Sequence, residues 1–393
     1  MSTLRTTTTA TTAGACVWSQ PQTDRLLLTD LFAAYYHARS NKRSTASQMK
    51  FERRLSENLI RLYNEILSRT YRPGRSMCFI ISDPVKREVF AATFRDRVVH
   101  HYLYDKLEPV FERAFIYDSY SCRKGKGTLF GVGRLEHHIR SCSRNHTREA
   151  FVLKLDIEGY FMSIDRNILY DIIVRHIDKC RRSGKLAEGF DYDTVKFLLH
   201  DVVFLDPTKG CRIKGLKSDW KSLPASKSLF HSAPGCGLPI GNLTSQLFSN
   251  VYLGELDQFV KRTLKFEHYG RYVDDFYIVD ESRQRLQAAI PLIEDFLRNH
   301  LHLRLNARKI RVIPASGPVP FLGSVVSPNG RRPERRSLKR MRGKYLEALN
   351  YERSPYRFAS VHNSCMGYLS HFNAKHHLLS GRARLSGGRV EFK

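Results

Sequence analysis

Three aspartates lie in apolar surroundings where a lone carboxylate is unfavourable. Asp156 is part of the segment LKLDIEGYF, and Asp274 and Asp275 are adjacent in RYVDDFYIV. A carboxylate buried in a strand is costly unless it is paired or holds a cation. A tight hairpin that turns on two aspartates presents both at one end of a sheet, so pairing with the Asp156 strand would bring three carboxylates together. Such hard oxygen ligands suit Mg²⁺, which takes its remaining ligands from water and substrate phosphates.

The specificity of this pattern comes from its context. The chain contains 20 aspartates, so about one adjacent pair is expected by chance in 393 residues. An aromatic-flanked pair between two apolar strands, preceded by an aspartate in another strand, is much more specific. Two Mg²⁺ ions at such a site could activate an attacking hydroxyl and stabilise a leaving pyrophosphate oxygen.

The elements that must position these aspartates follow from apolar spacing. Phe151–Glu158 alternates as a strand, and His268–Val273 and Phe276–Val279 flank the aspartate pair as a hairpin. Two more short strands are expected at Lys309–Pro314 and Pro320–Ser327. Helices are predicted over Leu26–Ala38, Met49–Arg69, Phe94–Phe111, Arg166–Asp178, Leu243–Leu264, Arg283–Asn299 and Ser337–Leu349.

The remaining segments read as loops, and the order of elements then indicates a fold class. Asp118–Gly133 is polar and glycine-rich, and residues from about 179 to 234 are irregular and basic. A helix-rich start, a strand–helix unit, a hairpin and a basic final helix together predict an α+β core flanked by helical lobes.

Composition favours a polyanionic partner. Lys and Arg total 65 against 38 acidic residues, a net charge of +27, and 42% of residues are hydrophobic, which excludes a disordered chain. Residues 331–393 alone hold 15 Lys/Arg and 4 Asp/Glu. Because cations interleaved with 19 Tyr and 23 Phe suit phosphates and unstacked bases, we expect nucleic-acid binding. No apolar run approaches the length needed to cross a bilayer, so a membrane protein is not expected.

The eight cysteines do not have the spacing of a zinc site. None forms a C-x-x-C pair, and His100–His101, His137–His138 and His376–His377 have no paired cysteines nearby. We therefore expect reduced, buried thiols in a cytoplasmic protein.

Three ordered motifs resemble those of reverse transcriptases. YVDDF is similar to the family's YxDD box, LKLDIEGYFMSID to its first catalytic-aspartate motif, and GLPIGNLTSQLFSNVYL to the loop and helix that touch template and nucleotide. The resemblance extends from about Arg95 to Gly323. It implies a right-hand polymerase with fingers, a palm of antiparallel sheet plus helices, and a helical thumb.

Residues 1–17 contain the threonine-rich run Thr6–Thr12 and are expected to be a flexible N-terminal tail, outside the resemblance. The resemblance implies a division of the rest of the chain, in which residues 18–150 would be the N-terminal helices and fingers. Residues 151–327 would be the palm, with a basic insertion at about 179–234, and 328–393 the basic helical thumb and C-terminal tail.

Carried over position by position, the resemblance implies a two-metal site. Asp156 and Asp274 would be the principal ligands of two Mg²⁺ ions, with Mn²⁺ as an alternative. Asp275 would assist, and the carbonyl of Ile157 would be an additional oxygen ligand. Lys309 resembles the lysine that protonates the departing pyrophosphate, and the alternative is a surface lysine without a role.

Further positions match the family's nucleotide and primer contacts. Phe161 matches the aromatic steric gate that excludes a ribose 2′-hydroxyl, although a core role is the alternative. Gly241 permits close backbone approach to the nucleotide. The matching nucleotide-binding cations are Arg95, Arg97, Arg123 and Lys124, each of which could instead be a solvated loop charge, and Phe321, Leu322 and Gly323 resemble the primer grip.

A finer resemblance is to the reverse transcriptases of diversity-generating retroelements. These carry IGxxxSQ where most relatives have QGxxxSP, and this chain reads IGNLTSQ from Ile240 to Gln246. The resemblance implies copying of a template-repeat RNA into cDNA, with frequent misincorporation opposite adenine, and a basic accessory variability determinant protein as partner. Ile240 and Gln246 would then influence fidelity, and Gln246 would also contact the nucleotide, since fidelity depends on differences in transition-state binding.

Two alternatives remain at this point. The chain could be a reverse transcriptase of a group II intron, retron or phage-defence system, or a non-catalytic RNA-binding palm scaffold. No HNH-type signature and no RNase H-like acidic array follow the motifs. A bacterial or phage-encoded cytoplasmic enzyme that binds template RNA, cDNA and dNTPs is the interpretation that accounts for all three motifs.

Overall fold

The protein is described here from a computed structural model that covers residues 22–40, 45–83, 85–350 and 355–372 and the short strands 384–386 and 389–391. The predicted tail over residues 1–17 lies outside this range, as does most of the chain after residue 372. The described residues form mixed helices and strands, which confirms the predicted α+β class. They divide into two compact units.

The first unit comprises the described residues up to Val110 together with Ile173–Lys221 and Pro239–Thr244. It is helical with one small sheet. Its elements are α1 (Gln22–Arg39), α2 (Ala46–Glu52), α3 (Leu55–Leu67), β1 (Met77–Ile81), β2 (Arg87–Ala91), most of α4 (Phe94–Glu112), the later part of α7 (Arg166–Arg182), α8 (Tyr192–Val203) and β4 (Arg212–Ile213).

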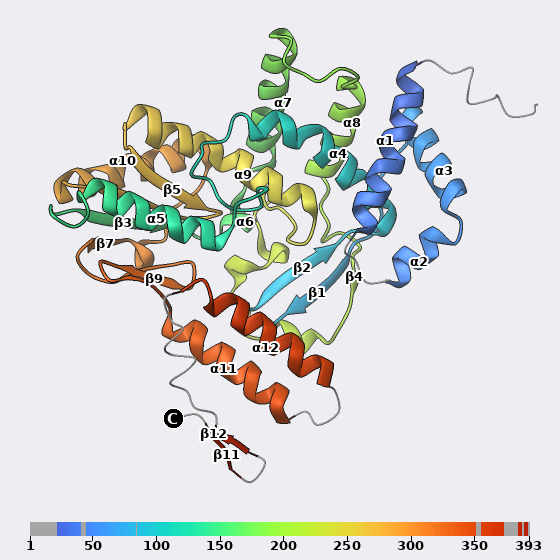
Figure 1. Ribbon diagram of the computed structural model, residues 1–393. Helices are drawn as coiled ribbons and strands as arrows, with labels where there is room; N and C mark the ends of the chain where they lie inside the picture. The colour runs from blue at the N-terminus through green and yellow to red at the C-terminus, as the bar shows by residue number, and fades with distance from the viewer. Residues whose placement is uncertain are drawn as a thin grey trace, which may run out of the picture. The chain divides into compact units, whose positions relative to one another are not determined.

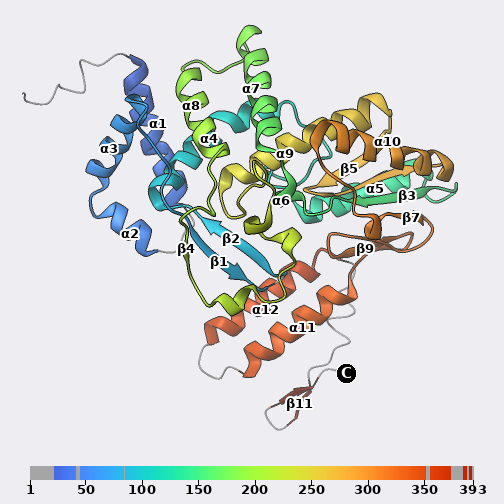
Figure 2. The ribbon, with the colours of Figure 1, turned by 180° about the vertical axis from the view of Figure 1, so that it is seen from behind.

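The small sheet has the strand order β2-β1-β4. β1 and β2 pair as an antiparallel hairpin, whereas β4 adds a short parallel edge on which the Lys214 amide donates to the Cys78 carbonyl at 2.8 Å (Figure 2). On the other edge, the Phe90 amide donates to the Ile240 carbonyl at 2.9 Å. The loop that carries Ile240 is therefore fixed to the outer strand of this sheet.

Two predictions of secondary structure in this unit were wrong. The single helix expected over Met49–Arg69 breaks at Arg53–Arg54 into α2 and α3, because Arg54 leaves helical geometry with φ −134°. The stretch expected to be irregular contains α8, which begins where the Asp191 carboxylate accepts from the Thr194 amide at 3.0 Å. Its buried Val195, Leu198 and Leu199 form an apolar face that basic neighbours obscured in the sequence.

The second unit comprises Phe111–Ile172, Ser222–Leu238 and the described residues from Ser245 onward. It contains the predicted catalytic strand and hairpin. Its elements are α5 (Thr128–Cys142), β3 (Phe151–Asp156), α6 (Tyr160–Ser163), most of α9 (Leu243–Gln258), β5 (His268–Tyr272), β6 (Asp275–Asp280), α10 (Arg283–Leu301), β7 (Arg311–Pro314), β8 (Val319–Phe321), β9 (Ser324–Ser327), β10 (Gly330–Pro333), α11 (Arg335–Asn350), α12 (Pro355–Leu369), β11 (Arg384–Ser386) and β12 (Arg389–Glu391).

The central sheet of this unit is antiparallel with the order β5-β6-β3-β7. Helices α5 and α10 cover opposite sides of it (Figure 1). Side chains alternate between the two faces of a strand. Tyr277 and Val279 accordingly join a core that includes Val132 and Leu135 of α5. Strands β3, β5 and β6 are thus buried in their central parts, whereas the edge strand β7 is more exposed.

A second, three-stranded sheet of order β10-β9-β8 precedes the helix pair α11 and α12. The predicted basic helix Ser337–Leu349 corresponds to α11, and the strand expected over Pro320–Ser327 is the β8–β9 hairpin. The glycine-rich loop predicted as far as Gly133 ends earlier, because α5 begins at Thr128. Glycines at these positions did not prevent helix formation.

Two further properties concern the described residues as a whole. No helix among them is long and apolar enough to span a membrane. Their cysteines are free thiols: Cys78 and Cys142 are buried as predicted, but Cys122 is exposed. Cys16 lies outside the described range.

Candidate active site

The strand register brings Asp156 and the aspartate pair together. Asp156 at the end of β3 lies directly opposite Asp275 at the start of β6, and directly opposed residues of antiparallel strands share a face of the sheet. Asp274 immediately precedes β6 in the turn from β5. The expected meeting of a strand aspartate with a hairpin aspartate pair is therefore present.

Lys309 contributes a cation to this group. Its Nζ lies 2.7 Å from Oδ2 of Asp156, and Asn306 Nδ2 lies 3.4 Å from Oδ1 of the same carboxylate. The Asn306 amide also donates to the Asp156 carbonyl at 2.8 Å, which fixes this segment beside β3. Partial burial alone would lower the pKa of Lys309, but its hydrogen bond to Asp156 and the nearby carboxylates raise it. The ammonium is therefore protonated at neutral pH.

The two hairpin aspartates are crowded by negative charge. Burial, followed by the charges of Asp156 and Asp275, raises the pKa of Asp274 from 3.8 to about 6. Burial also raises the pKa of Asp275, while Lys154 opposes this shift from 3.8 Å. The cations present compensate this carboxylate cluster only in part.

The residues present fit a divalent cation. Partly buried carboxylate oxygens with uncompensated charge are the donors that Mg²⁺ takes. Among the described residues, no three Asp, Glu, His or Cys side chains form a complete metal-ligand set. Mg²⁺ typically binds through one or two carboxylates and receives its other ligands from substrate phosphates and water, so a partial protein set is the pattern expected of a substrate-completed site.

Ile157 and Phe161 follow the first aspartate. Ile157 is buried and pairs with Leu305 in an isolated bridge, whose hydrogen bonds use the Glu158 amide and the Asp156 carbonyl. Phe161 lies in α6, is partly exposed, and packs edge-on against Tyr160 with ring centroids 5.4 Å apart. The ring is therefore not a fully buried core side chain.

Arg123 is engaged by its own loop. Its guanidinium bonds to both carboxylate oxygens of Glu112 at 2.6–3.1 Å and to the carbonyls of Ile116 and Ser119 at 2.6 and 2.8 Å. Lys124, the next residue, is exposed. The structure therefore uses Arg123 to fix the shape of the loop that presents Lys124.

Of the two arginines in α4, Arg95 is held by partners within the protein, whereas Arg97 is not. Arg95 is paired with Glu65 and with Asp96 at 3.1 Å, and it lies over the Tyr71 ring at 4.6 Å from the centroid. Arg97 has no ion pair or side-chain hydrogen bond within the described ranges, and burial lowers the pKa of its guanidinium. Of the two, Arg97 is the cation available to an anionic ligand.

The local packing and backbone conformation require a glycine at position 241. Its φ is +123°, and an added Cβ would lie 2.8 Å from Val89 Cγ1 and 3.1 Å from the Phe90 carbonyl oxygen of β2. Ile240 before it is partly buried. Gln246, in the first turns of α9, is exposed, and its side chain makes no hydrogen bond to another described residue.

The predicted primer-grip turn joins β8 to β9. Phe321 is buried against Tyr277 of β6 with ring centroids 5.1 Å apart, while Leu322 and Gly323 both have positive φ. The Gly323 carbonyl accepts from Ser337 Oγ at 3.1 Å and from Tyr368 at 3.2 Å, in α11 and α12 respectively. This turn is therefore tied to the catalytic sheet on one side and to the helix pair on the other.

Comparison with known protein families decides the identity. Residues 86–326, more than half of the 393-residue chain, match the family described as reverse transcriptase (RNA-dependent DNA polymerase). The chain belongs to the reverse transcriptase family. It is an RNA-directed DNA polymerase, a nucleotidyltransferase class that uses a nucleic-acid template, dNTPs and divalent metal ions.

Individual relatives of this reverse transcriptase are distant. It is 24% identical over 307 residues to Protein YkfC of Escherichia coli (strain K12), which covers 69% of this chain and 71% of YkfC. Among solved structures it is similar to apo telomerase from Candida Tropicalis truncated from C-terminal domain, with a TM-score of 0.47 and 11% identity over 66% of this chain. The chain spans 55% of the length of that telomerase chain.

Sequence reasoning missed two polar contacts of the reverse transcriptase site. Lys154 lies two residues before Asp156, and Asn306 three residues before Lys309. Alternation places Lys154 on the same face as Asp156, a signal that could have been used. Asn306 had no such signal, because its contact with Asp156 joins segments 150 residues apart.

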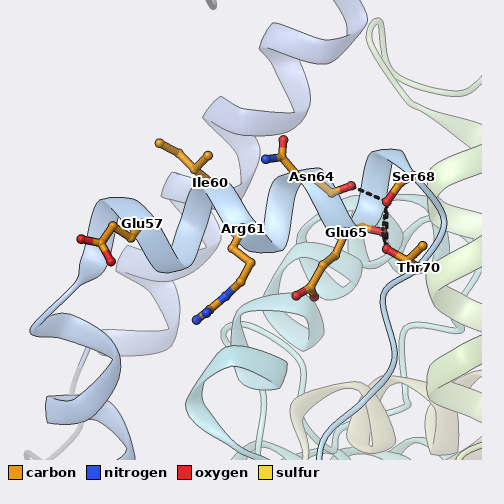
Figure 3. A pocket seen from close by; sticks show the side chains of 7 residues that line it. All are labelled: Glu57, Ile60, Arg61, Asn64, Glu65, Ser68 and Thr70. Carbon is orange, nitrogen blue, oxygen red and sulfur yellow. Dashed lines mark hydrogen bonds between the residues drawn. The ribbon is translucent and has the colours of Figure 1, made fainter. Parts of the chain in front are cut away.

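Elsewhere, the reverse transcriptase has a shallow depression that is lined by residues of α3 and of the segment just after it. Ser68 Oγ bonds the Asn64 carbonyl at 2.7 Å and lies 2.8 Å from Thr70 Oγ1 within it (Figure 3). Other polar side chains of the lining bond residues outside it, since Glu65 pairs with Arg95 and Arg61 bonds Asn58. The lining consists of Glu57, Ile60, Arg61, Asn64, Glu65, Ser68 and Thr70.

Proposed function

We propose that this reverse transcriptase serves a diversity-generating retroelement. It would copy a template-repeat RNA into cDNA, with frequent misincorporation opposite adenine, for transfer into a variable gene. The support is the IGNLTSQ segment from Ile240 to Gln246 in place of the commoner QGxxxSP. A basic accessory variability determinant protein would be its partner, and the fingers, palm and thumb would follow the segments expected above.

The aspartate cluster carries the proposed chemistry. Asp156, Asp274 and Asp275 would hold two Mg²⁺ ions, with the Ile157 carbonyl as a further oxygen ligand. When bound, these ions activate the primer 3′-hydroxyl and stabilise the leaving pyrophosphate oxygen. The register pairing of Asp156 with Asp275 across β3 and β6 places these carboxylates at one end of two buried, paired strands.

Lys309 supplies the proposed acid. Its ammonium is held 2.7 Å from Asp156 and is protonated at neutral pH. As negative charge develops on the leaving pyrophosphate, Lys309 would transfer a proton from Nζ to that oxygen. The Asp156 carboxylate orients Nζ and favours the protonated amine until phosphate oxygens compete for it.

The nucleotide would be bound by the cations that lack internal partners. Lys124 and Arg97 are proposed to contact triphosphate oxygens, since neither is committed to an acidic neighbour. Arg123 and Arg95 would reach a phosphate only by exchanging their present partners, so we assign them to shaping the binding segments. The partly exposed Phe161 ring would exclude a ribose 2′-hydroxyl.

The remaining contacts concern the template and the primer. Gly241 would permit backbone approach of the nucleotide or template, and the exposed Gln246 would touch the nascent base pair. Phe321, Leu322 and Gly323 would position the primer end through the turn that links the sheet to α11 and α12.

The catalytic assignment is tested by dNTP addition to a primer on an RNA template with Mg²⁺. Asp274→Asn should lower kcat by about 10³-fold or more, because a metal-ligating oxygen is lost. Asp280→Asn is the matched control, since Asp280 ends the same strand but pairs with Arg285 at 2.6 Å. Equal activity of Asp274→Asn and the wild type would reject the assignment.

The retroelement assignment is tested by sequencing the cDNA. Ile240→Gln and Gln246→Pro restore the residues of the commoner motif, so misincorporation opposite adenine should fall severalfold while incorporation opposite other bases stays similar. Unaltered adenine errors in both variants would remove the proposed fidelity role. A nearby pair of repeats that differ at adenine positions would support the retroelement, whereas an intron or retron RNA would support the alternative.

A further inference from the structure

Arg271 is a fully buried arginine that contacts three different segments. It lies in β5, three residues before Asp274. Its Nε and Nη2 donate to the two oxygens of Asp257 at 2.7 and 2.6 Å, and its Nη1 donates to the Val273 carbonyl at 3.1 Å. Longer bonds of 3.4 Å reach Asn250 Oδ1 and Ser119 Oγ. One guanidinium therefore joins α9, the β5–β6 turn and the segment before Arg123.

The turn that Arg271 holds is strained. Val273 has φ +55°, in the left-handed region that is unfavourable for a β-branched residue. Such a residue persists only where its surroundings over-determine it, and these positions cluster at functional sites. Val273 directly precedes Asp274. The orientation of the peptide between them therefore sets the position of the Asp274 backbone and the direction in which its side chain leaves it. The bond from Arg271 to the Val273 carbonyl fixes that peptide.

On its other side, Arg271 fixes the segment that leads to Arg123 and Lys124. The Arg271 amide donates to the Asp118 carbonyl, and the Tyr120 amide donates to the Arg271 carbonyl, both at 2.9 Å. Ser119 between them accepts from Arg123 through its carbonyl at 2.8 Å. The cation loop is thus attached to the same residue that holds the aspartate turn.

We propose that Arg271 is a positioning residue that keeps the Asp274 carboxylate in register with the loop carrying Lys124. It acts through the Val273 peptide and the Asp118–Tyr120 segment and does not touch the substrate. The inference rests on the proposed function, in which Asp274 is a metal ligand. A buried ion pair such as Arg271–Asp257 is weak evidence for stability by itself, because desolvation offsets much of the attraction between the charges, so we assign the pair a role in orientation.

Arg271→Lys in the full chain tests this proposal. Lysine can keep a charge next to Asp257, but its single ammonium cannot reproduce the planar fork that also reaches Val273 and Ser119. We expect kcat for dNTP addition to fall by about 10²-fold, as for a displacement of roughly 1 Å at a reacting group, with a much smaller change in the KM for dNTP. Affinity for Mn²⁺, measured by electron paramagnetic resonance, should fall with it.

A second substitution separates orientation from simple stabilisation. Glycine adopts positive φ without penalty, so adding Val273→Gly to Arg271→Lys should restore part of the lost kcat and Mn²⁺ affinity. Arg285→Lys is the matched control, because Arg285 also pairs with an aspartate and with two backbone carbonyls at 3.2 Å but lies outside the aspartate turn. It should retain wild-type kcat.

If Arg271→Lys does not fold, the triple variant Arg271→Met, Asp257→Leu and Tyr269→Phe replaces the ion pair, and the Tyr269 hydroxyl that bonds Asp257, by apolar side chains and should preserve the core. It is expected to lose kcat and Mn²⁺ affinity to a similar degree. Wild-type kcat and Mn²⁺ affinity in a folded Arg271 variant, or no restoration by Val273→Gly, would overturn the proposal. Absence of dNTP addition by the wild type would instead reject the proposed function, and the Mn²⁺ measurement would still report on Arg271.

Discussion

The aspartate end of the β5-β6-β3-β7 sheet and the part of α4 that carries Arg97 have opposite charge imbalances. At the aspartate end of the sheet, partly buried carboxylates outnumber their cations, and burial and neighbouring charges raise the pKa of Asp274 to about 6. In α4, Arg97 is half-buried with no acidic partner among the described residues, and burial lowers its pKa. Uncompensated buried charge reduces stability. Each imbalance therefore marks a place where a ligand of opposite sign, a divalent cation or a phosphate, would complete the electrostatics.

The two regions also differ in the buried polar side chains beside them. Beside the aspartate sheet, the Tyr120 and Tyr277 hydroxyls share a hydrogen bond of 2.8 Å, and the Tyr277 hydroxyl lies 3.1 Å from His138 Nδ1. In the unit that contains most of α4, burial keeps His100 neutral at neutral pH, and its Nδ1 lies 2.8 Å from Thr244 Oγ1.

The largest effect is expected from Gly270→Ala in the aspartate sheet. An added Cβ would overlap the hydroxyl of Tyr120 and lie 2.6 Å from that of Tyr277, both of which are fully buried. Overpacking that also breaks a buried hydrogen-bond network should lower the free energy of unfolding by about 3 kcal/mol or more. Urea denaturation measures this. Gly254→Ala, where nothing lies within 4 Å of the added Cβ, is the control and should be close to the wild type.

Acid should destabilise the unit that contains most of α4, through His100. Burial lowers the pKa of His100 from 6.5 to about 4, with His101 and Arg97 in the same direction and Asp96 opposing. Since the unfolded chain then binds the proton more readily, stability is complete above pH 6.5 and declines as the pH falls to 4, by about 3 kcal/mol. His100→Asn, which can still bond Thr244 but does not titrate, should remove this part of the pH dependence. An unchanged pH profile in this variant would contradict the assignment.

Asp274→Asn should stabilise the metal-free protein while abolishing polymerisation. The substitution removes one charge from a crowded, buried carboxylate cluster, so the free energy of unfolding in EDTA at neutral pH should rise by about 1–2 kcal/mol. Thermal melting with and without Mg²⁺ gives the measurement. Asp280→Asn, which loses its partner Arg285, should show no such gain. A loss of stability in Asp274→Asn would mean that nearby cations or hydrogen-bond donors already stabilise the charged Asp274 carboxylate.

The smallest effect is expected from the arginines of α4. Arg97→Leu should leave stability unchanged or raise it by up to about 1 kcal/mol, because a half-buried charge without a partner is removed. The KM for dNTP should rise about tenfold if Arg97 contacts a phosphate. Arg95→Leu is the comparison: it leaves Glu65 and Asp96 without their cation and should destabilise the protein instead. Equal behaviour of the two variants would remove the distinction between them.

Local patterns predicted the catalytic part of this fold, and long-range contacts account for what they missed. Alternation in Phe151–Glu158 and on either side of Asp274 identified β3, β5 and β6, because period-two burial is encoded in a few adjacent residues. The position of Asn306 beside Asp156 depends on which segments become neighbours, whereas alternation within β3 already placed Lys154 on the face of Asp156. Helix α8 was missed since basic residues around it suggested a loop.

The sequence predicted which cationic residues could bind the nucleotide, but not which of them have acidic partners in the folded protein. The sequence places Arg95, Arg97, Arg123 and Lys124 among nucleotide-binding candidates with equal support. The structure shows that Arg95 and Arg123 have acidic partners, Glu65 and Glu112, which lie 30 and 11 residues away. No spacing rule of a helix or turn connects such pairs, so the distinction between a binding cation and a structural one required the fold.

Direct titration of Mn²⁺ into the metal-free protein, followed by electron paramagnetic resonance, tests whether oxygens from β3 and from the β5–β6 turn hold divalent cations. The account predicts saturable binding that Mg²⁺ displaces and that weakens at least about tenfold in both Asp156→Asn and Asp274→Asn, but not in Asp280→Asn. Binding of wild-type strength in both variants would contradict it.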